Sequence, residues 1–171
     1  EIAGAYRLGE IWRWQGQQKT KLYSQSLFDY QPSIQPLFVQ GLELGRSFVQ
    51  PQYWGLRSLD YLWQGIGAYL ASHPQVRYLF GPVSLSNNMP KPARDMLVHF
   101  YETHFADPDH FALAAIPYVI DTDSGTDLRQ HMPGLDFDMD HEWLRNQLGF
   151  MGLKIPTLFK QYADVCTPGG V

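Results

Sequence analysis

Cysteine is nearly absent from this sequence, in which Cys166 is the one cysteine among 171 residues. The chain therefore cannot form an internal disulfide, and it lacks the cysteine cluster of a structural zinc site. No apolar run approaches the ~20 residues that a membrane-spanning helix needs, and no secretory signal is visible. The simplest interpretation is a domain of a reducing compartment, with the cytoplasm as the expected location.

An excess of positive charge is also lacking. Lysine and arginine number 13 against 17 aspartate and glutamate residues, which gives a formal net charge of −4. A protein that binds nucleic acid electrostatically is normally basic, so nucleic acid is not an expected partner. Hydrophobic residues make up 44% of the chain, which is enough for one core at this length. We therefore predict a single domain over residues 1–171.

Several patterns of hydrolases and metalloproteins are missing. There is no Gly-x-Ser-x-Gly nucleophile elbow. His99 and His104 do not have the spacing of the two-histidine zinc motif. The acidic run at 136–140 resembles the opening of a calcium loop, but His141 stands at the glycine position and Gln147 at that of the closing glutamate. We predict no metal site and interpret the run as a solvated loop.

An initiator methionine is lacking as well. The sequence begins at Glu1, directly before small and apolar residues that predict a strand over Ile2–Leu8. It ends on Pro168–Val171, a stretch typical of a turn. We therefore expect both ends to be cut from a longer protein.

The middle of the chain has the clearest hydrophobic pattern. Leucine, phenylalanine and valine with a small glycine predict a strand over Leu42–Val49, and Pro51–Gly55 predicts a turn. Apolar residues then recur at helical spacing from Leu56 to the breaker His73-Pro74. A second strand is expected over Val76–Leu85, interrupted by a Gly-Pro pair, and a second helix follows it.

Three further segments are less regular. Trp12 and Trp14 are two apart, which suits one face of a strand or hairpin arm; a surface loop is the alternative. Residues 107–140 are rich in Asp, Pro, Gly and His, which predicts irregular structure. A short helix is expected over His141–Leu148, and an apolar stretch follows within 152–165.

The predicted turn before the first helix has the chemistry of an anion site. A turn that leads into a helix N-terminus gathers unpaired N–H groups, which bind phosphate or pyrophosphate. The segment from Gln52 to Arg57 resembles the acyl-thioester loop of the GNAT acyltransferases, which reads Gln or Arg, two residues, Gly, one residue, then Gly or Ala. Gln52 and Gly55 match this loop, whereas Arg57 replaces the small residue and offers a guanidinium to a phosphate. A plain strand-to-helix turn is the alternative.

Other motifs resemble the ornithine-lipid-type N-acyltransferases, often labelled hemolysin-like, and occur in the family's order. Their Glu-x-x-Arg core is also similar to that of the acyl-homoserine-lactone synthases. The segments that carry the resemblance are Tyr23-Ser24, Glu43–Ser47, Leu62–Ile66, Tyr78–Ser86 and Leu153–Tyr162. The resemblance implies a GNAT-type α/β fold, with a twisted mixed sheet flanked by helices. In that fold two central strands splay apart and the thioester arm inserts between them, and a bulge at Gly81 would suit such a gap.

The resemblance also implies transfer of a long fatty acyl group from acyl-carrier protein or acyl-CoA to an amine, such as ornithine or a lipid headgroup. The attacking amine must lose a proton, and the developing oxyanion needs hydrogen-bond donors. Glu43 is the candidate base, by its motif position; a structural ion pair with Arg46 or another cation is the alternative. Arg46 is expected to hold the polar substrate or to fix Glu43, and Ser84 to donate near the thioester.

The family suggests acyl-carrier protein as a partner and peripheral contact with the inner membrane face. Two rival functions fit the same motifs. A signal synthase of the acyl-homoserine-lactone type would use S-adenosylmethionine and short acyl chains. A non-enzymatic, hemolysin-like module would bind membranes without releasing a thiol.

Overall fold

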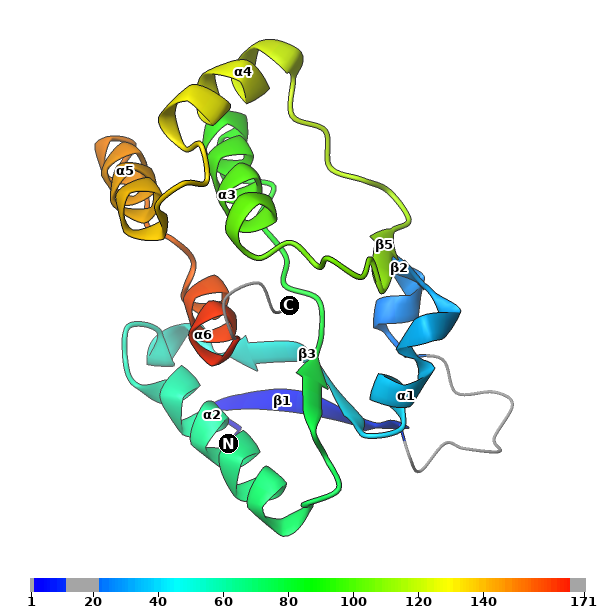
Figure 1. The fold of residues 1–171 in the computed structure, drawn as a ribbon. Helices are drawn as coiled ribbons and strands as arrows, with labels where there is room; N and C mark the ends of the chain where they lie inside the picture. The colour runs from blue at the N-terminus through cyan, green and yellow to red at the C-terminus, as the bar shows by residue number, and fades with distance from the viewer. Residues whose placement is uncertain (1, 12–21, 167–171) are drawn as a thin grey trace. The chain divides into compact units, whose positions relative to one another are not determined.

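The computed structural model describes residues 2–11 and 22–166, and these divide into two compact units (Figure 1). The first unit comprises Glu1–Pro82 with Phe111–Ile116, and the second comprises Val83–His110 with Pro117–Val171. The expectation of one domain over residues 1–171 stays a prediction. Trp12 and Trp14, for which a strand or hairpin arm was considered, lie outside the described residues.

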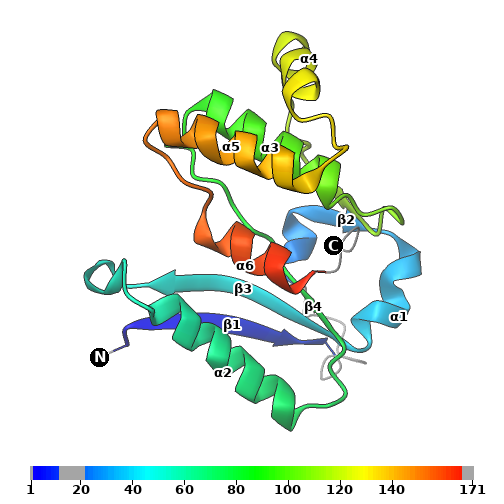
Figure 2. The ribbon, with the colours of Figure 1, turned by 60° about the vertical axis from the view of Figure 1, so that its left-hand side comes forward.

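The first unit contains a mixed three-stranded sheet in the order β1-β3-β4. Strand β1 (Gly4–Glu10) is antiparallel to the central strand β3 (Gly41–Val49), and β4 (Tyr78–Phe80) is parallel to β3. The parallel connection runs through helix α2 (Ser58–Ser72), which lies along β1 in Figure 2. The predicted fold class, an α/β arrangement with a mixed sheet and helices, is confirmed.

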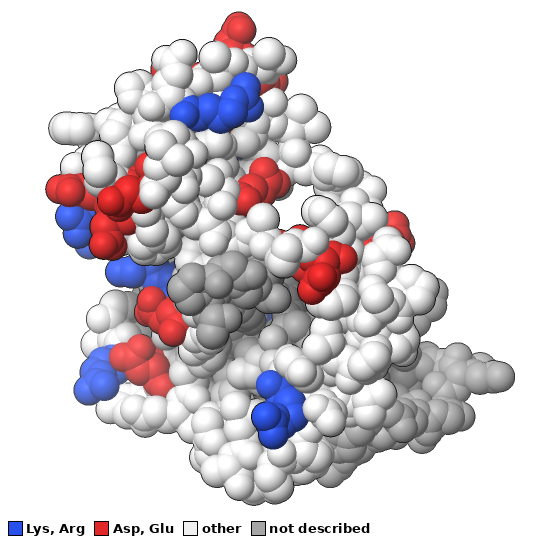
Figure 3. All heavy atoms as spheres, viewed as in Figure 1, with Lys and Arg blue, Asp and Glu red and all other residues white. Residues whose placement is uncertain are grey.

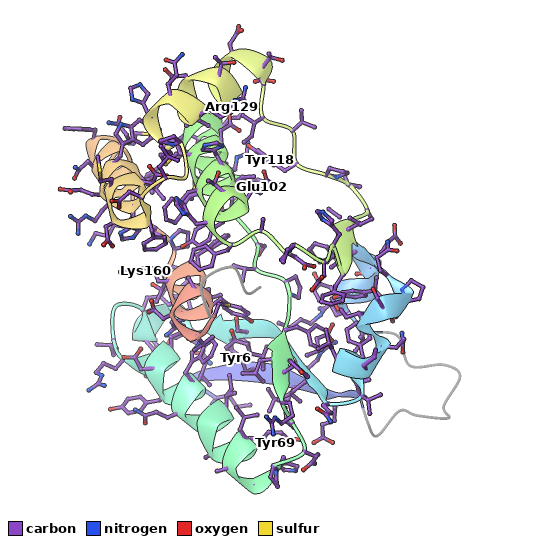
Figure 4. The ribbon with its side chains drawn as sticks, viewed as in Figure 1. Tyr6, Tyr69, Glu102, Tyr118, Arg129 and Lys160 are labelled. Carbon is purple, nitrogen blue, oxygen red and sulfur yellow. The ribbon has the colours of Figure 1, made fainter. Side chains whose placement is uncertain are left out.

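Helix α2 is fixed to β1 by aromatic side chains. Trp63 meets Tyr6 edge to face, with ring centroids 6.3 Å apart. Tyr69, which Figure 4 labels together with Tyr6, donates a hydrogen bond from its phenolic hydroxyl to Glu10. The predicted helical pattern is thus confirmed, with its start two residues later than Leu56, after the 3-10 turn η4 (Pro51–Tyr53).

The first unit also contains a second, two-stranded sheet. Strands β2 (Phe28–Tyr30) and β5 (Ala112–Ala114) pair antiparallel. The segments around β2 are η2 (Ser24–Ser26), η3 (Pro32–Ile34) and α1 (Gln35–Phe38). Their small core consists of Leu22, Ile34 and Phe38, with Tyr30 and Phe80 packed against it.

Strand β3 contains a β-bulge opposite β1, which the alternation of side chains in the sequence does not predict. Arg7 pairs with Gly45 but Ala5 pairs with Phe48, so β3 holds one residue more than β1 between these two pairs. Arg46, within this bulge, has the left-handed φ of 48°. An extra residue of this kind bends the strand and re-aims its side chains.

The parallel pairing of β3 and β4 is short. It covers Gly41–Glu43 of β3 and ends at Phe80, whereas β3 continues beside β1 to Val49. The expected strand Val76–Leu85 is therefore reduced to Tyr78–Phe80. The predicted interruption at Gly81-Pro82 is confirmed, because β4 ends at Phe80. At Gly81 the Leu44 backbone approaches so closely that no room is left for a side chain.

The second unit is helical within the described residues. It consists of α3 (Lys91–His104), α4 (Thr122–His131), α5 (Phe137–Phe150) and α6 (Thr157–Val165). Helix α3 contacts both α4 and α5. The buried core is Ala93, Met96, Leu97, Phe100, Leu128, Met132, Leu144, Leu148 and Ile155.

The expectation of irregular structure over 107–140 was wrong in part, because this region contains β5, α4 and the start of α5. The first turns of α4 consist of polar residues, and Leu128 is its one buried leucine. The hydrophobic pattern of the sequence therefore does not reveal this helix. The acidic run is not a solvated loop. Asp136 caps α5 by accepting a hydrogen bond from the Met139 N–H at 3.0 Å, and Asp140 is buried.

None of the described helices combines the length and apolar character needed to cross a membrane. On the face drawn in Figure 3, charged side chains of the described residues are scattered in small groups among uncharged ones. The described residues on that face form no broad basic patch of the kind that nucleic acid would bind.

Candidate active site

Glu43 lies in the central strand with an exposed fraction of 0%. Its Oε1 accepts hydrogen bonds from the Ser24 N–H at 2.8 Å and the Ser24 hydroxyl at 2.6 Å. Its Oε2 accepts from Arg7 Nη2 at 2.6 Å and from the Tyr23 N–H at 3.2 Å. A carboxylate offers about four lone-pair sites, so the described residues satisfy this one fully.

These contacts fix the charge of Glu43. Burial by itself would raise the pKa of the carboxyl group, because it disfavours the charged form. The hydrogen bonds from Ser24, Arg7 and Tyr23 outweigh burial, and the pKa falls below its ordinary value of 4.5. Glu43 is therefore ionised at neutral pH.

The lowered pKa predicts an acid-sensitive fold. Because the carboxyl of Glu43 has a lower pKa folded than unfolded, it stabilises the protein above the unfolded value of 4.5. This stabilisation is lost as the pH falls through the folded pKa. We expect the free energy of unfolding, measured by urea denaturation from pH 7 to pH 3, to fall more in the native protein than in Glu43→Gln. Equal slopes in the two proteins would contradict the assignment.

Tyr23 contacts Glu43 through its backbone N–H and both Arg46 and Arg7 through its ring. The Arg46 guanidinium carbon lies 4.7 Å from the centre of the Tyr23 ring, and that of Arg7 lies 5.8 Å from it. Such contacts between a cation and an aromatic face are favourable. Arg46 is exposed and Arg7 has 43% of its side chain exposed, so both guanidiniums reach solvent beside the buried carboxylate.

The structure therefore places the predicted pair Glu43 and Arg46 together, but the cation bound to Glu43 is Arg7. Arg7 stands in no recognisable motif, and Tyr23-Ser24 carries only a resemblance to the family, from which no role was predicted for either residue. The available signal was the position of Arg7 in a strand that pairs with the Glu43 strand, which becomes informative only once the register is known.

The turn that follows β3 is exposed and carries the predicted donor-binding residues. Gln52 lies in η4, and Gly55 adopts a φ of 77° that favours glycine. Trp54 donates from its indole N–H to the Val49 carbonyl at 2.8 Å, which ties the turn to the end of β3. Arg57 is the N-cap residue of α2 and provides no side-chain cap to the helix.

Arg57 forms only a weak, solvent-exposed ion pair. Its Nε lies 3.3 Å from Asp60 Oδ2, and the two side chains are 73% and 48% exposed. An exposed pair of this kind contributes little, because water and salt screen it. Ser84 is exposed and falls in the second unit, outside the unit that holds the other five predicted site residues. Its role stays a prediction.

His99 and His104 of the second unit have structural partners. His104 Nε2 lies 2.8 Å from Asp140 Oδ2, with 9% of the His104 side chain and 3% of the Asp140 side chain exposed. The same oxygen accepts a hydrogen bond from the Gly134 N–H at 2.9 Å. His99 Nε2 lies 3.0 Å from the Met132 carbonyl oxygen. Over residues 2–11 and 22–166, no group of three or more His, Cys, Asp or Glu side chains is placed to hold a metal ion.

Comparison with known proteins identifies the class to which this arrangement corresponds. Residues 1–64, which contain β1, β3 and the Glu43 site, match the family described as acetyltransferase (GNAT) domain. The resemblance predicted from the sequence is confirmed, and the chain is a homologue of the GNAT acyltransferases.

Its relatives include two proteins named glycine N(alpha)-acyltransferase. The one from Bacteroides thetaiotaomicron is 32% identical over 175 residues, which cover 96% of this chain and 52% of the relative. The one from Phocaeicola vulgatus is 31% identical over 176 residues, with 96% and 53% covered. An L-ornithine N(alpha)-acyltransferase from Brucella abortus is 30% identical over 119 residues, with 69% and 41% covered.

The chain thus spans about half the length of the curated relatives it matches. No solved structure matches it.

Proposed function

We propose that this chain is an N-acyltransferase domain that moves an acyl group from a thioester to the α-amine of an amino acid. The observation that carries the proposal is the ionised, buried Glu43 at the point where the pairing of β3 with β4 ends. Sequence similarity to proteins named for glycine and for ornithine, each with an α-amine, supports the choice of acceptor.

The donor is acyl-carrier protein or acyl-CoA, both of which carry phosphate. The turn from Gln52 to Arg57 leads into the 15-residue helix α2, whose N-terminus favours negative charge. Arg57 adds a weakly engaged cation at this end of the helix. We therefore assign the phosphate-bearing part of the donor to this turn.

In the reaction, the amine nitrogen forms a bond to the thioester carbonyl carbon and the carbon–sulfur bond breaks, so that the products are an amide and a thiol. An ammonium group of the acceptor first loses one proton to water, because only the neutral amine can attack. The proton that the attacking amine then loses passes to a base and on to the leaving thiolate. Glu43 is the proposed base, directly or through a water molecule. Of its four accepted hydrogen bonds, that from the Tyr23 N–H is the longest at 3.2 Å. The Oε2 lone pair used by this bond is therefore the easiest to release to an amine or a water.

Thiol release tests the function directly. The protein is incubated with a long-chain acyl thioester, with and without glycine or ornithine. Thiol release that depends on the amine would support the N-acyltransferase. Absence of release with every amine, together with firm binding to lipid vesicles, would overturn it in favour of a membrane-binding module.

The assignment of the donor turn gives a second expectation. Replacing Arg57 by alanine should weaken binding of acyl-CoA by about 3- to 10-fold, because an exposed contact between a guanidinium and phosphate is worth on the order of 1 kcal/mol. Isothermal titration at two salt concentrations would measure the loss, which should shrink at high salt. Unchanged affinity at low salt would return Arg57 to the ordinary surface residues.

A further inference from the structure

Three residues of the first unit share one face of the sheet. Arg7 lies directly opposite Gly45 in the antiparallel pair, and Glu43 is two residues from Gly45 along β3. Directly opposite residues point to the same side of a sheet, as do residues two apart in one strand. The Arg7 guanidinium therefore reaches Glu43 across the position where Gly45 has no side chain, in keeping with their 2.6 Å contact.

The bulge in β3 brings a second cation to that face. In a regular strand, Arg46 would point away from the side on which Glu43 lies, because successive side chains alternate. Here Glu43 accepts from the Tyr23 N–H while Arg46 lies over the Tyr23 ring. The left-handed φ of 48° at Arg46 accompanies this change of direction, and it is a strained conformation for a residue other than glycine.

The described residues leave the space over Gly45 unfilled. Gly45 is buried, yet a methyl group added to it would have no atom of the described residues within 4 Å beyond its own chain neighbours. Among the described residues, no carboxylate pairs with Arg46. Arg7 donates a hydrogen bond to the described residues only from its Nη2. A guanidinium has five N–H donors, so both arginines keep donors for a ligand.

We propose that Arg46 and Arg7 bind the α-carboxylate of the amino-acid acceptor beside Gly45. The inference rests on the proposed function and names the group by which that site recognises its substrate. Guanidinium and carboxylate match in charge and in planar, bidentate geometry. An amino acid seated there presents its anionic end to the arginines and its amine toward Glu43. The single negative charge of Glu43 favours such a zwitterion over a phosphate dianion.

The test compares glycine with glycinamide, which has the same amine but no carboxylate. The variant is Arg46→Gly, because glycine adopts the left-handed φ without strain and the fold should be kept. We expect the ratio of kcat/KM for glycine to that for glycinamide to fall about 10- to 100-fold in Arg46→Gly, as for loss of a charged hydrogen bond. Arg77→Ala, which removes an exposed arginine of the same unit, should leave the ratio unchanged.

A fall of both substrates by the same factor in Arg46→Gly would overturn the carboxylate site while leaving the N-acyltransferase intact. If no amine supports thiol release, the proposed function fails instead, and binding decides the site separately. Glycine labelled with ¹³C at its carboxyl carbon is then titrated by NMR against the native protein and Arg46→Gly. Binding to the native protein that is lost in the variant supports the site, and equal binding or none to either protein overturns it.

Discussion

Glutamine in place of Glu43 is expected to lower kcat by about 10²- to 10⁴-fold, the usual contribution of a positioned general base. The amide keeps the shape of the side chain but cannot take up the amine proton. Donor affinity, measured by titration with a non-hydrolysable acyl-CoA analogue, should stay within about twofold, because the donor turn is a separate part of the chain. A variant that keeps full turnover at pH 7 would show that Glu43 is not the base.

Ser24→Ala separates the role of a base from that of a structural carboxylate. The hydroxyl of Ser24 donates to Glu43 at 2.6 Å and helps to lower its pKa. Without it, the pKa of Glu43 should rise, and the acidic limb of the pH dependence of kcat should move to higher pH. If Glu43 only holds its neighbours in place, the variant loses stability but the position of this limb does not change.

Among glycine-to-alanine substitutions in the first unit, Gly81→Ala should reduce the stability of the fold the most. The added carbon would lie 1.9 Å from the Leu44 carbonyl oxygen, a distance that no packed structure tolerates. Both groups belong to backbone, so neither can turn aside as a flexible side chain would, and the strands must separate. We expect a loss of about 3 kcal/mol in the free energy of unfolding, which corresponds to a melting temperature lower by about 10 °C.

Gly65→Ala is the matched control for this experiment. Gly65 lies within α2, and an added methyl group there meets nothing within 4 Å. Alanine favours a helix by about 1 kcal/mol over glycine, so this variant should melt at the same temperature as the native protein or slightly higher. Equal melting temperatures for Gly81→Ala and the native protein would contradict the close approach of β4 to Leu44.

Local pattern in the sequence was sufficient for the central strand and its following helix. Leu42 and Leu44 predicted the strand and Ile66 the buried side of the helix, because burial there follows a simple period. Gly81-Pro82 predicted the interruption of the next strand, since proline cannot donate to a sheet ladder. The rule failed for α4, whose first turns are polar and whose buried side consists of little more than Leu128.

The site was predictable only as far as motifs reach. Glu43 and Arg46 were predicted from a spaced motif in one strand, but Arg7, the cation that binds Glu43, lies 36 residues from it. Which side of a strand a residue occupies depends on register, and one extra residue changes it for all that follow. The bulge at Arg46 leaves no mark in the hydrophobic pattern, so its contact with Tyr23 could be found only in three dimensions.

The three neighbours of Glu43 also bear on how the first unit assembles. Its hydrogen-bond donors come from residues 19, 20 and 36 positions away. Bonds of that separation must close a long loop of the chain, and the entropy lost in closing it slows folding. The amide of Ser24 points at a carboxylate that is itself buried in the sheet, so its proton is released to solvent only when β3 is exposed. In native-state hydrogen exchange, Ser24 should therefore open together with the middle of β3, although it lies in a short turn.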